Sequence, residues 1–280
     1  AGRDRTVTAN PHGKTAVLLI HGLGGTSYDL GVLQKALRSA GAVTHAPTLP
    51  GHGTHPHDLI GTRAEAWLDT LTQTYLQLTT EHETVHIAGM CMGALLALVL
   101  AHRVQHGAAR PQDRLALLAT PLHIDGWSTP WYRELRHVVY RIPGMAARMR
   151  VDEAEPFGIK NPLLRRIIKA KLARGDTFHY PWVPLTCIRE VDRLRGWAHA
   201  AAPETTCQTL LIHAREDELT SLRSAETLQA TLPNARSVVL ENSYHMVCVD
   251  NDRDLVAAEV LGFFGFDAAA VRRKSPATAD

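Results

Sequence analysis

The stretch of sequence that decides the fold is residues 85–94, VHIAGMCMGA. An apolar run suited to a strand leads into Gly-x-Cys-x-Gly, centred on Cys91, and then into an apolar helical pattern that reaches Ala101. Small residues flank Cys91 because a sharp strand-to-helix turn strains the middle residue and leaves no room for neighbouring Cβ atoms. Such a turn would present the sulfur at the carboxyl edge of a sheet, where the dipole of the following helix favours thiolate. The alternative is a buried structural cysteine that follows a strand.

Working outward from this stretch, short apolar runs alternate with helical patterns, which is typical of βαβ units and a parallel sheet. Each pair of parallel strands needs a crossover, and the helical patterns supply it. We predict strands at residues 16–20, 43–47, 85–88, 115–119, 209–213 and 237–240, and helices at 30–39, 64–78, 92–105, 224–232 and 254–264.

The alternation stops after Thr120 and resumes near Thr209, and the chain between these points is basic and rich in helical periodicity. Residues 127–203 contain 14 Lys and Arg against seven Asp and Glu, although the whole chain carries a net charge of only +2. Such asymmetry marks a segment with its own role. We therefore predict a core made of residues 1–126 and 204–266, a helical basic cap at 127–203, and a flexible tail at 267–280.

Three further motifs follow predicted strands. The first strand ends in His21-Gly22-Leu23-Gly24-Gly25, which has neither of the usual glycine patterns of a phosphate-binding loop. The strand at 209–213 leads to Asp217, with Glu216 and Glu218 as adjacent alternatives, and the last strand leads to His245. A single histidine is more often structural than catalytic, so the position of His245 after that strand is what makes it a candidate.

Together these motifs resemble those of the α/β-hydrolase family, with Cys91 where most members carry serine. The turn at residues 50–53, Pro-Gly-His-Gly, is similar to that of the carboxylesterase and monoacylglycerol-lipase branch, where its role is structural. The resemblance covers roughly residues 15–264 apart from the cap. It implies an α/β-hydrolase fold, a mostly parallel sheet flanked by helices, with the family's N-terminal antiparallel hairpin shortened or missing.

The resemblance also implies the roles of the candidate residues. Cys91, Asp217 and His245 stand in the family's order of nucleophile, acid and base. The acid is the least settled of these, because Ala214 replaces a glycine that is usual in its motif. The backbone N–H groups of Leu23 and Met92 would form the oxyanion hole.

These residues imply an ester or thioester hydrolase that forms an acyl-cysteine intermediate. Thioesters are favoured, because a thiolate exchanges one thioester for another at nearly equal free energy, whereas a more basic alkoxide must leave an ester. An acyltransferase that passes the acyl group from a carrier thioester to an alcohol, amine or thiol is the alternative. A non-enzymatic ligand receptor and an engineered Ser→Cys esterase also remain open.

The cap contains an amphipathic segment, residues 161–172, whose basic residues Arg165, Arg166 and Lys169 lie mostly away from an apolar stripe. A lid helix over the pocket and a membrane-surface helix are two interpretations. The third is a docking site for an acyl carrier protein or for the phosphates of coenzyme A, which opposite charge would attract.

Composition excludes several other classes. The longest apolar run, residues 93–101, is about half of the ~20 residues that span a bilayer, and no secretory signal is visible. The four cysteines are scattered without a Cys-x-x-Cys pair, which argues against a zinc ribbon or a disulfide framework and favours a cytoplasmic location. We expect no metal, no cofactor and no nucleic-acid partner.

Overall fold

A parallel sheet forms the centre of the computed structural model, which describes residues 15–268. Within that range the main sheet has six strands in the order β2-β1-β3-β4-β7-β8, and every neighbouring pair is parallel. The strands are β1 (Thr15–Ile20), β2 (Val43–His45), β3 (Thr84–Met90), β4 (Arg114–Leu118), β7 (Gln208–Ala214) and β8 (Ala235–Leu240). All six strands were predicted, and their ends differ from prediction by two residues or fewer.

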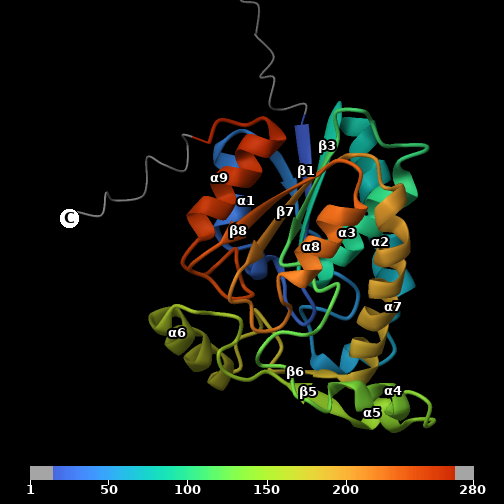
Figure 1. Ribbon diagram of the computed structural model, residues 1–280, viewed down its shortest axis with the longest axis vertical. Coiled ribbons are helices and arrows are strands. Elements are labelled where there is room, and N and C mark those ends of the chain that lie inside the picture. Colours follow the sequence, from blue (N-terminus) through green and yellow to red (C-terminus); the bar gives the residue numbers. More distant parts are fainter. Residues whose placement is uncertain (1–14, 269–280) are drawn as a thin grey trace, which may run out of the picture.

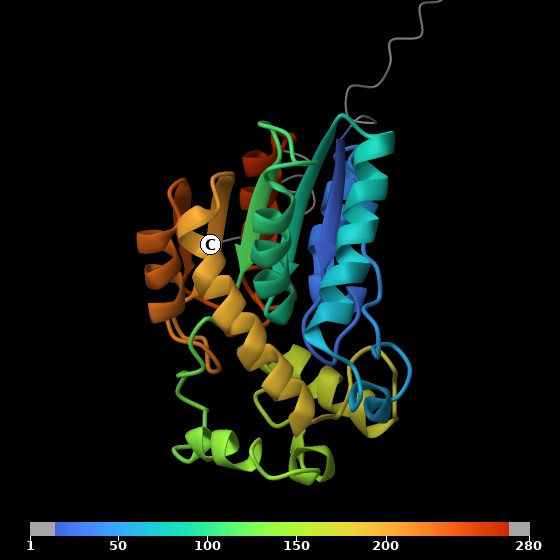
Figure 2. The ribbon, with the colours of Figure 1, turned by 90° about the vertical axis from the view of Figure 1, so that its right-hand side faces the viewer.

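Helices cover both faces of this sheet (Figures 1 and 2). Helices α1 (Gly31–Ser39) and α9 (Arg253–Phe264) pack on one face, and the other face carries α2 (Ala64–Glu81), α3 (Met92–Val104), α7 (Leu185–Ala201) and α8 (Arg223–Thr231). Alternate residues of β1 face the two layers: Leu18 belongs to one apolar cluster, and Val17 and Leu19 belong to the other. This period of two divides the core into two halves.

Helix α3 is buried on all sides from Met92 to Ala101, because it lies against the sheet on one side and α7 and α2 on the other. An apolar sequence without polar faces is what such a position requires. The run 92–101 is therefore a core helix, and no helix within residues 15–268 is long and apolar enough to cross a membrane.

The chain between β4 and β7 builds a cap at the lower end of the molecule (Figure 1). It contains η4 (Arg133–Leu135), α4 (Arg136–Val139), α5 (Met145–Arg148), β5 (Arg150–Asp152), α6 (Pro162–Ala173) and β6 (Trp182–Pro184). Strands β5 and β6 pair in an antiparallel two-stranded sheet. Helix α7 then runs from the cap into the helical layer beside α3 (Figure 2), and its residues Val191 and Leu194 join the core.

Short 3-10 helices lie in the loops. Two of them, η2 (Ser27–Leu30) and η3 (Pro56–Leu59), lie at the cap end, and η5 (Ala202–Glu204) follows α7 at the opposite end of the sheet, where it contacts the last residues of α3. The predictions of a shortened N-terminal hairpin and of a flexible tail at 267–280 concern residues that lie, apart from 267 and 268, outside the described part of the chain.

The strand order reverses between β1 and β3, because the chain goes outward from β1 to β2 and then returns to the other side of β1. In open parallel sheets, ligands bind outside the carboxyl ends of the strands at such a switch point. The loop that begins at His21 follows β1, and Cys91 follows β3. The topology therefore brings these two segments to the place where a site is expected.

Candidate active site

Cys91 lies at a strained turn between β3 and α3, with φ 56° and ψ −125°. The two glycines that flank it are required by packing. A Cβ atom on Gly89 would lie 2.1 Å from the Gly93 carbonyl oxygen, and one on Gly93 would lie 2.2 Å from the Ile20 carbonyl oxygen. The Cys91 side chain is partly buried rather than enclosed, so the turn holds a thiol at the edge of the sheet.

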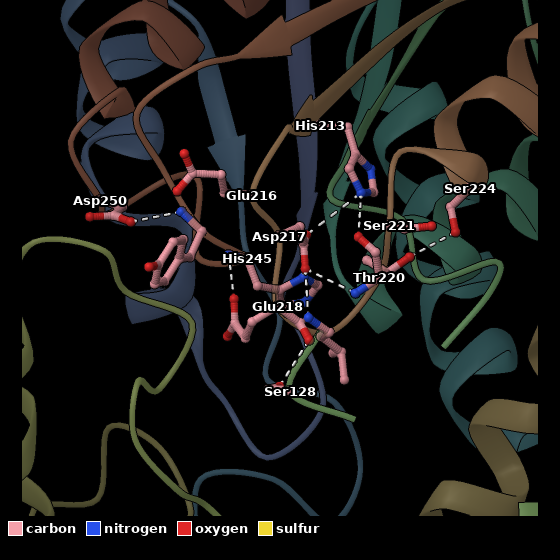
Figure 3. A network of polar contacts seen from close by, with 12 residues as sticks. Ser128, His213, Glu216, Asp217, Glu218, Thr220, Ser221, Ser224, His245 and Asp250 are labelled. Carbon is pink, nitrogen blue, oxygen red and sulfur yellow. Dashed lines mark hydrogen bonds and ion pairs between the residues drawn. The ribbon is translucent and has the colours of Figure 1, made fainter. Parts of the chain in front are cut away.

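Asp217 and His245 follow β7 and β8 and meet at the same edge (Figure 3). His245 Nδ1 lies 2.8 Å from Asp217 Oδ2, in a buried contact. The other carboxylate oxygen, Oδ1, accepts hydrogen bonds from the backbone N–H groups of Leu219 and Thr220 at 2.9 and 3.0 Å. The aspartate is therefore fixed by its own loop, and it fixes the imidazole in turn.

The three adjacent acids have three different contacts. Glu216 points to solvent and forms an ion pair with Lys160 at 2.9 Å. Glu218 Oε2 accepts a hydrogen bond from the backbone N–H of His245 at 3.1 Å, and it does not meet the ring. Of these acids, Asp217 is the one whose carboxylate contacts the imidazole.

The electrostatics of His245 follow from this arrangement. Burial alone would lower the pKa of His245, but the Asp217 carboxylate and then the Cys91 sulfur outweigh it and raise the pKa well above its usual value. Burial would raise the pKa of Asp217, and the charge on His245 lowers it instead. His245 Nε2 is buried and has no hydrogen-bond partner among residues 15–268. This nitrogen is therefore free to exchange a proton with Cys91, whose charge interacts with the His245 ring.

The loop after β1 is held against Cys91. His21 Nε2 accepts the Leu49 N–H at 3.1 Å, so its Nδ1 carries the proton and donates to the Gly22 carbonyl at 2.8 Å. A Cβ on Gly22 would lie 3.2 Å from Cys91 Cβ, which explains the glycine. Leu23 follows in this loop, while Met92 is the first residue of α3 and its N–H has no acceptor within the helix.

His52, from the Pro-Gly-His-Gly turn, packs behind this loop. Its ring stacks on Tyr180 at 6.3 Å and meets the edge of His21 at 4.9 Å. Burial lowers the pKa of His52 to about 3, so the ring is neutral at ordinary pH. Its contacts are those of a packing residue.

The basic residues of α6 are partly engaged within the cap. Arg165 folds back onto the carbonyl oxygens of Ile159 and Lys160, at distances of 3.0 to 3.2 Å. Lys169 forms an ion pair with Glu155. Arg166 is exposed like Lys169, but it forms no ion pair within residues 15–268.

Sequence reasoning missed one set of charged residues at this end of the sheet. Asp29 lies under the loop after β1, and the cap residues His179 and Glu153 lie beside it. No local motif connects them, because they lie far apart in the sequence and meet only through the path of the cap. An acidic residue shortly after the glycine-rich loop was the one available signal.

The parallel sheet flanked by helices, with a strained strand-to-helix turn at its switch point, defines an α/β scaffold. A family model described as "Alpha/beta hydrolase family" matches residues 17–259. The chain belongs to this family.

Its relatives are esterases and lipases by name. A thermostable monoacylglycerol lipase of Bacillus sp. (strain H-257) is 25% identical over 262 residues, covering 90% of this chain and 91% of the relative. A carboxylesterase of Bacillus subtilis (strain 168) is 24% identical over 266 residues, covering 92% and 97%. A pimeloyl-[acyl-carrier protein] methyl ester esterase of Aromatoleum aromaticum (strain DSM 19018 / LMG 30748 / EbN1) is 27% identical over 263 residues, covering 85% and 94%.

Solved structures show the same fold. A monoacylglycerol lipase from Paleococcus ferrophilus superposes with a TM-score of 0.72 at 20% identity, covering 91% of this chain and 94% of that one. A soluble variant of monoglyceride lipase from Saccharomyces cerevisiae superposes with a TM-score of 0.74 at 14% identity, covering 92% and 88%.

Proposed function

We propose that this chain hydrolyses carboxylic esters or thioesters through an acyl intermediate on Cys91. The observation that carries the proposal is the His245 ring, which is held by Asp217 on one nitrogen and leaves the other unpartnered beside Cys91. A nucleophile, a base and a residue that orients the base are the parts that acyl transfer needs. The names of the relatives, which are esterases and lipases, support the reaction class.

In the first step His245 Nε2 takes the proton of Cys91, and the thiolate attacks the substrate carbonyl carbon. The N–H groups of Leu23 and Met92 would stabilise the negative charge on the oxygen. The tetrahedral intermediate then collapses, the C–O or C–S bond to the leaving group breaks, and His245 returns the proton to the departing alcohol or thiol. In the second step the same nitrogen removes a proton from water, and the water oxygen forms a bond to the acyl carbon. The C–S bond to Cys91 then breaks, which releases the acid, and His245 returns the proton to the sulfur, which regenerates the thiol.

A cysteine nucleophile makes thioesters the better substrates, because attack exchanges one thioester for another at nearly equal free energy. The acyl-cysteine also remains activated, so an alcohol, amine or thiol in the site could replace water. This transfer activity is the second candidate, and the exposed Arg166 supports it as part of a surface for an acyl carrier protein or coenzyme A, together with Arg165 and Lys169.

The proposal is tested by intact-mass measurement after mixing the protein with a panel of acyl thioesters and simple esters. We expect a transient gain of one acyl mass, followed by release of the free acid. In a Cys91→Ala variant the gain should disappear while the fold persists, with stability changed by less than about 1 kcal/mol because the sulfur is not a core group. Cys207→Ala, which alters a partly buried cysteine outside the site, is the matched control and should keep the mass gain.

Two results would contradict this function. Full turnover by Cys91→Ala would exclude Cys91 as the nucleophile. Acylation that decays only when an alcohol, amine or thiol is added would replace hydrolysis with transfer.

A further inference from the structure

A buried carboxylate lies directly behind the loop after β1. Asp29 is only 1% exposed, and neither of its carboxylate oxygens accepts a hydrogen bond from any residue within 15–268. A Cβ on Gly25 would lie 1.7 Å from Asp29 Oδ2, so the carboxylate fills the space that this glycine leaves. A Cβ on Gly22 would lie 3.4 Å from the same oxygen and 3.2 Å from Cys91 Cβ. The carboxylate is thus separated from the nucleophile by a space about as wide as one methyl group.

A negative charge at this position opposes the proposed chemistry. Both the Cys91 thiolate and the oxyanion of the transition state carry negative charge, and like charges repel strongly where water is excluded. A buried carboxylate without hydrogen bonds is also costly in itself. The site therefore needs a positive charge close to Asp29.

The cap supplies that charge through His179. Its Nδ1 lies 3.5 Å from Asp29 Oδ1, and its Nε2 lies 3.4 Å from Glu153 Oε1. Burial would lower the pKa of His179, but the two carboxylates outweigh burial and raise the pKa well above its usual value. Among residues 15–268, His179 is the one cationic group in an ion pair with Asp29.

The backbone around His179 is fastened to the same loop. The Tyr180 N–H donates to the Gly24 carbonyl at 2.7 Å, and Thr26 Oγ1 donates to the Phe178 carbonyl at 2.9 Å. A Cβ on Gly24 would lie 3.5 Å from His179 Nε2, so the ring rests on this glycine. The cap segment 178–180 and the loop after β1 therefore form one packed unit.

The other titratable groups around this unit do not replace His179. Burial lowers the pKa of His21 and of His52, so both rings are neutral. Glu153 lies on the other side of His179. Burial would raise the pKa of Glu153, but His179 and then the charge of His245 lower it. Glu153 adds a second negative charge, so Asp29, Glu153 and His179 together carry a net charge of −1, and His179 is the one cation among them.

We propose that His179 is a positioning residue: as an imidazolium it neutralises Asp29 and so allows the loop after β1 to lie against a negatively charged Cys91 and oxyanion. The inference rests on the proposed function, since it assumes that Cys91 is the nucleophile. It makes closure of the cap a condition for reactivity, because the compensating charge belongs to the cap and the carboxylate to the core.

The test measures the rate at which iodoacetamide alkylates Cys91 as a function of pH, followed by peptide mass. In His179→Gln we expect the pH midpoint of alkylation to rise and the rate at pH 7 to fall roughly tenfold or more, the effect of one unscreened charge several ångströms away. The double variant Asp29→Asn/His179→Gln carries neither charge and should regain most of the wild-type rate. His137→Gln, an exposed histidine of the cap, is the matched control and should leave the midpoint unchanged.

The single variant Asp29→Asn gives an independent result if His179→Gln fails to fold. Removing the carboxylate should leave alkylation as fast as in the wild type or faster. Thr26→Ala removes a neutral tether to the same cap segment but keeps both charges, so it should move the pH midpoint by much less than His179→Gln does.

Three results would overturn the inference: an unchanged midpoint in His179→Gln, a double variant as slow as His179→Gln, or an Asp29→Asn variant that reacts about tenfold more slowly than wild type. Failure of the proposed function gives a different signature, since Cys91→Ala would then keep its turnover whatever the alkylation data show.

Discussion

Two histidines at this end of the sheet each face a buried aspartate, and they differ in what holds them. Asp217 accepts two backbone hydrogen bonds from its own loop and a short contact from the His245 ring at 2.8 Å. Asp29 accepts no hydrogen bond among residues 15–268, and its ion-pair partner, His179, stands 3.5 Å away on the cap. The first pair is thus preorganised by the core alone, and the second exists only while the cap is in place.

This difference separates two tasks. A base that must keep its orientation through the reaction benefits from an aspartate that the backbone has already fixed. The charge that compensates Asp29 comes instead from the cap, whose segment 178–180 is packed against the loop after β1. We therefore expect substitutions in the first pair to affect reactivity most, and those in the second to affect its dependence on pH.

The largest effect is expected from His245→Ala. Losing the base should lower kcat/KM by roughly 10²–10⁴-fold, the usual contribution of general acid–base catalysis. Steady-state kinetics on one ester and one thioester, with circular dichroism to verify folding, measure it. A loss of less than threefold on both substrates would remove His245 from the mechanism.

Asp217→Asn is expected to cost less, roughly tenfold to a hundredfold, because a thiolate needs less general-base help than a serine alkoxide. Glu216→Gln is the matched control, since its carboxylate pairs with Lys160 at the surface. If Asp217→Asn were silent and Glu216→Gln inactive, the acid would be assigned one residue too late.

The pair on the cap should appear in the pH dependence of stability. Folding raises the pKa of His179 above 6.5. The ion pairs of His179 therefore stabilise the fold fully below pH 6.5, and this stabilisation is lost as the pH rises through the pKa that His179 has in the folded protein. His179→Gln should therefore lower the free energy of unfolding by about 3 kcal/mol at pH 6, and by less at high pH. Urea unfolding of both proteins between pH 5 and 10 tests this; a constant difference would refute it.

The smallest effect is expected from Arg166→Ser. With a coenzyme A or acyl-carrier-protein thioester at ~0.05 M salt, kcat/KM should fall by roughly twofold to threefold, and the loss should vanish at ~0.5 M salt because exposed charges are then screened. A short neutral thioester should not respond. Equal losses with both substrates would favour a plain lid helix over a docking surface.

The sheet and its helices could be predicted because their signals are local: β-branched and leucine runs for strands, and apolar periodicity for helices such as α2 and α9. The turn at Cys91 was predictable for the same reason, since Gly89 and Gly93 mark the two places where a Cβ would collide with backbone. The choice among Glu216, Asp217 and Glu218 stayed open, because three neighbouring acids differ only in where a loop turns each of them.

The pairing of Asp29 with His179 could not be predicted, because no local pattern reports a contact between residues so far apart in the sequence. The cap also carries weak signals: α4 and α5 have four residues each, too few to show a period. The position of residues 178–180 depends on the path that the chain follows through the whole cap.

Rapid quenching can detect an acyl intermediate on Cys91 directly. The protein is mixed with an acyl thioester, quenched in acid at successive times, and digested for peptide mass analysis. We expect acyl-Cys91 to form at least as fast as kcat and to decay no more slowly than kcat. Acyl-Cys91 that is absent, or that forms or decays more slowly than turnover, would contradict it.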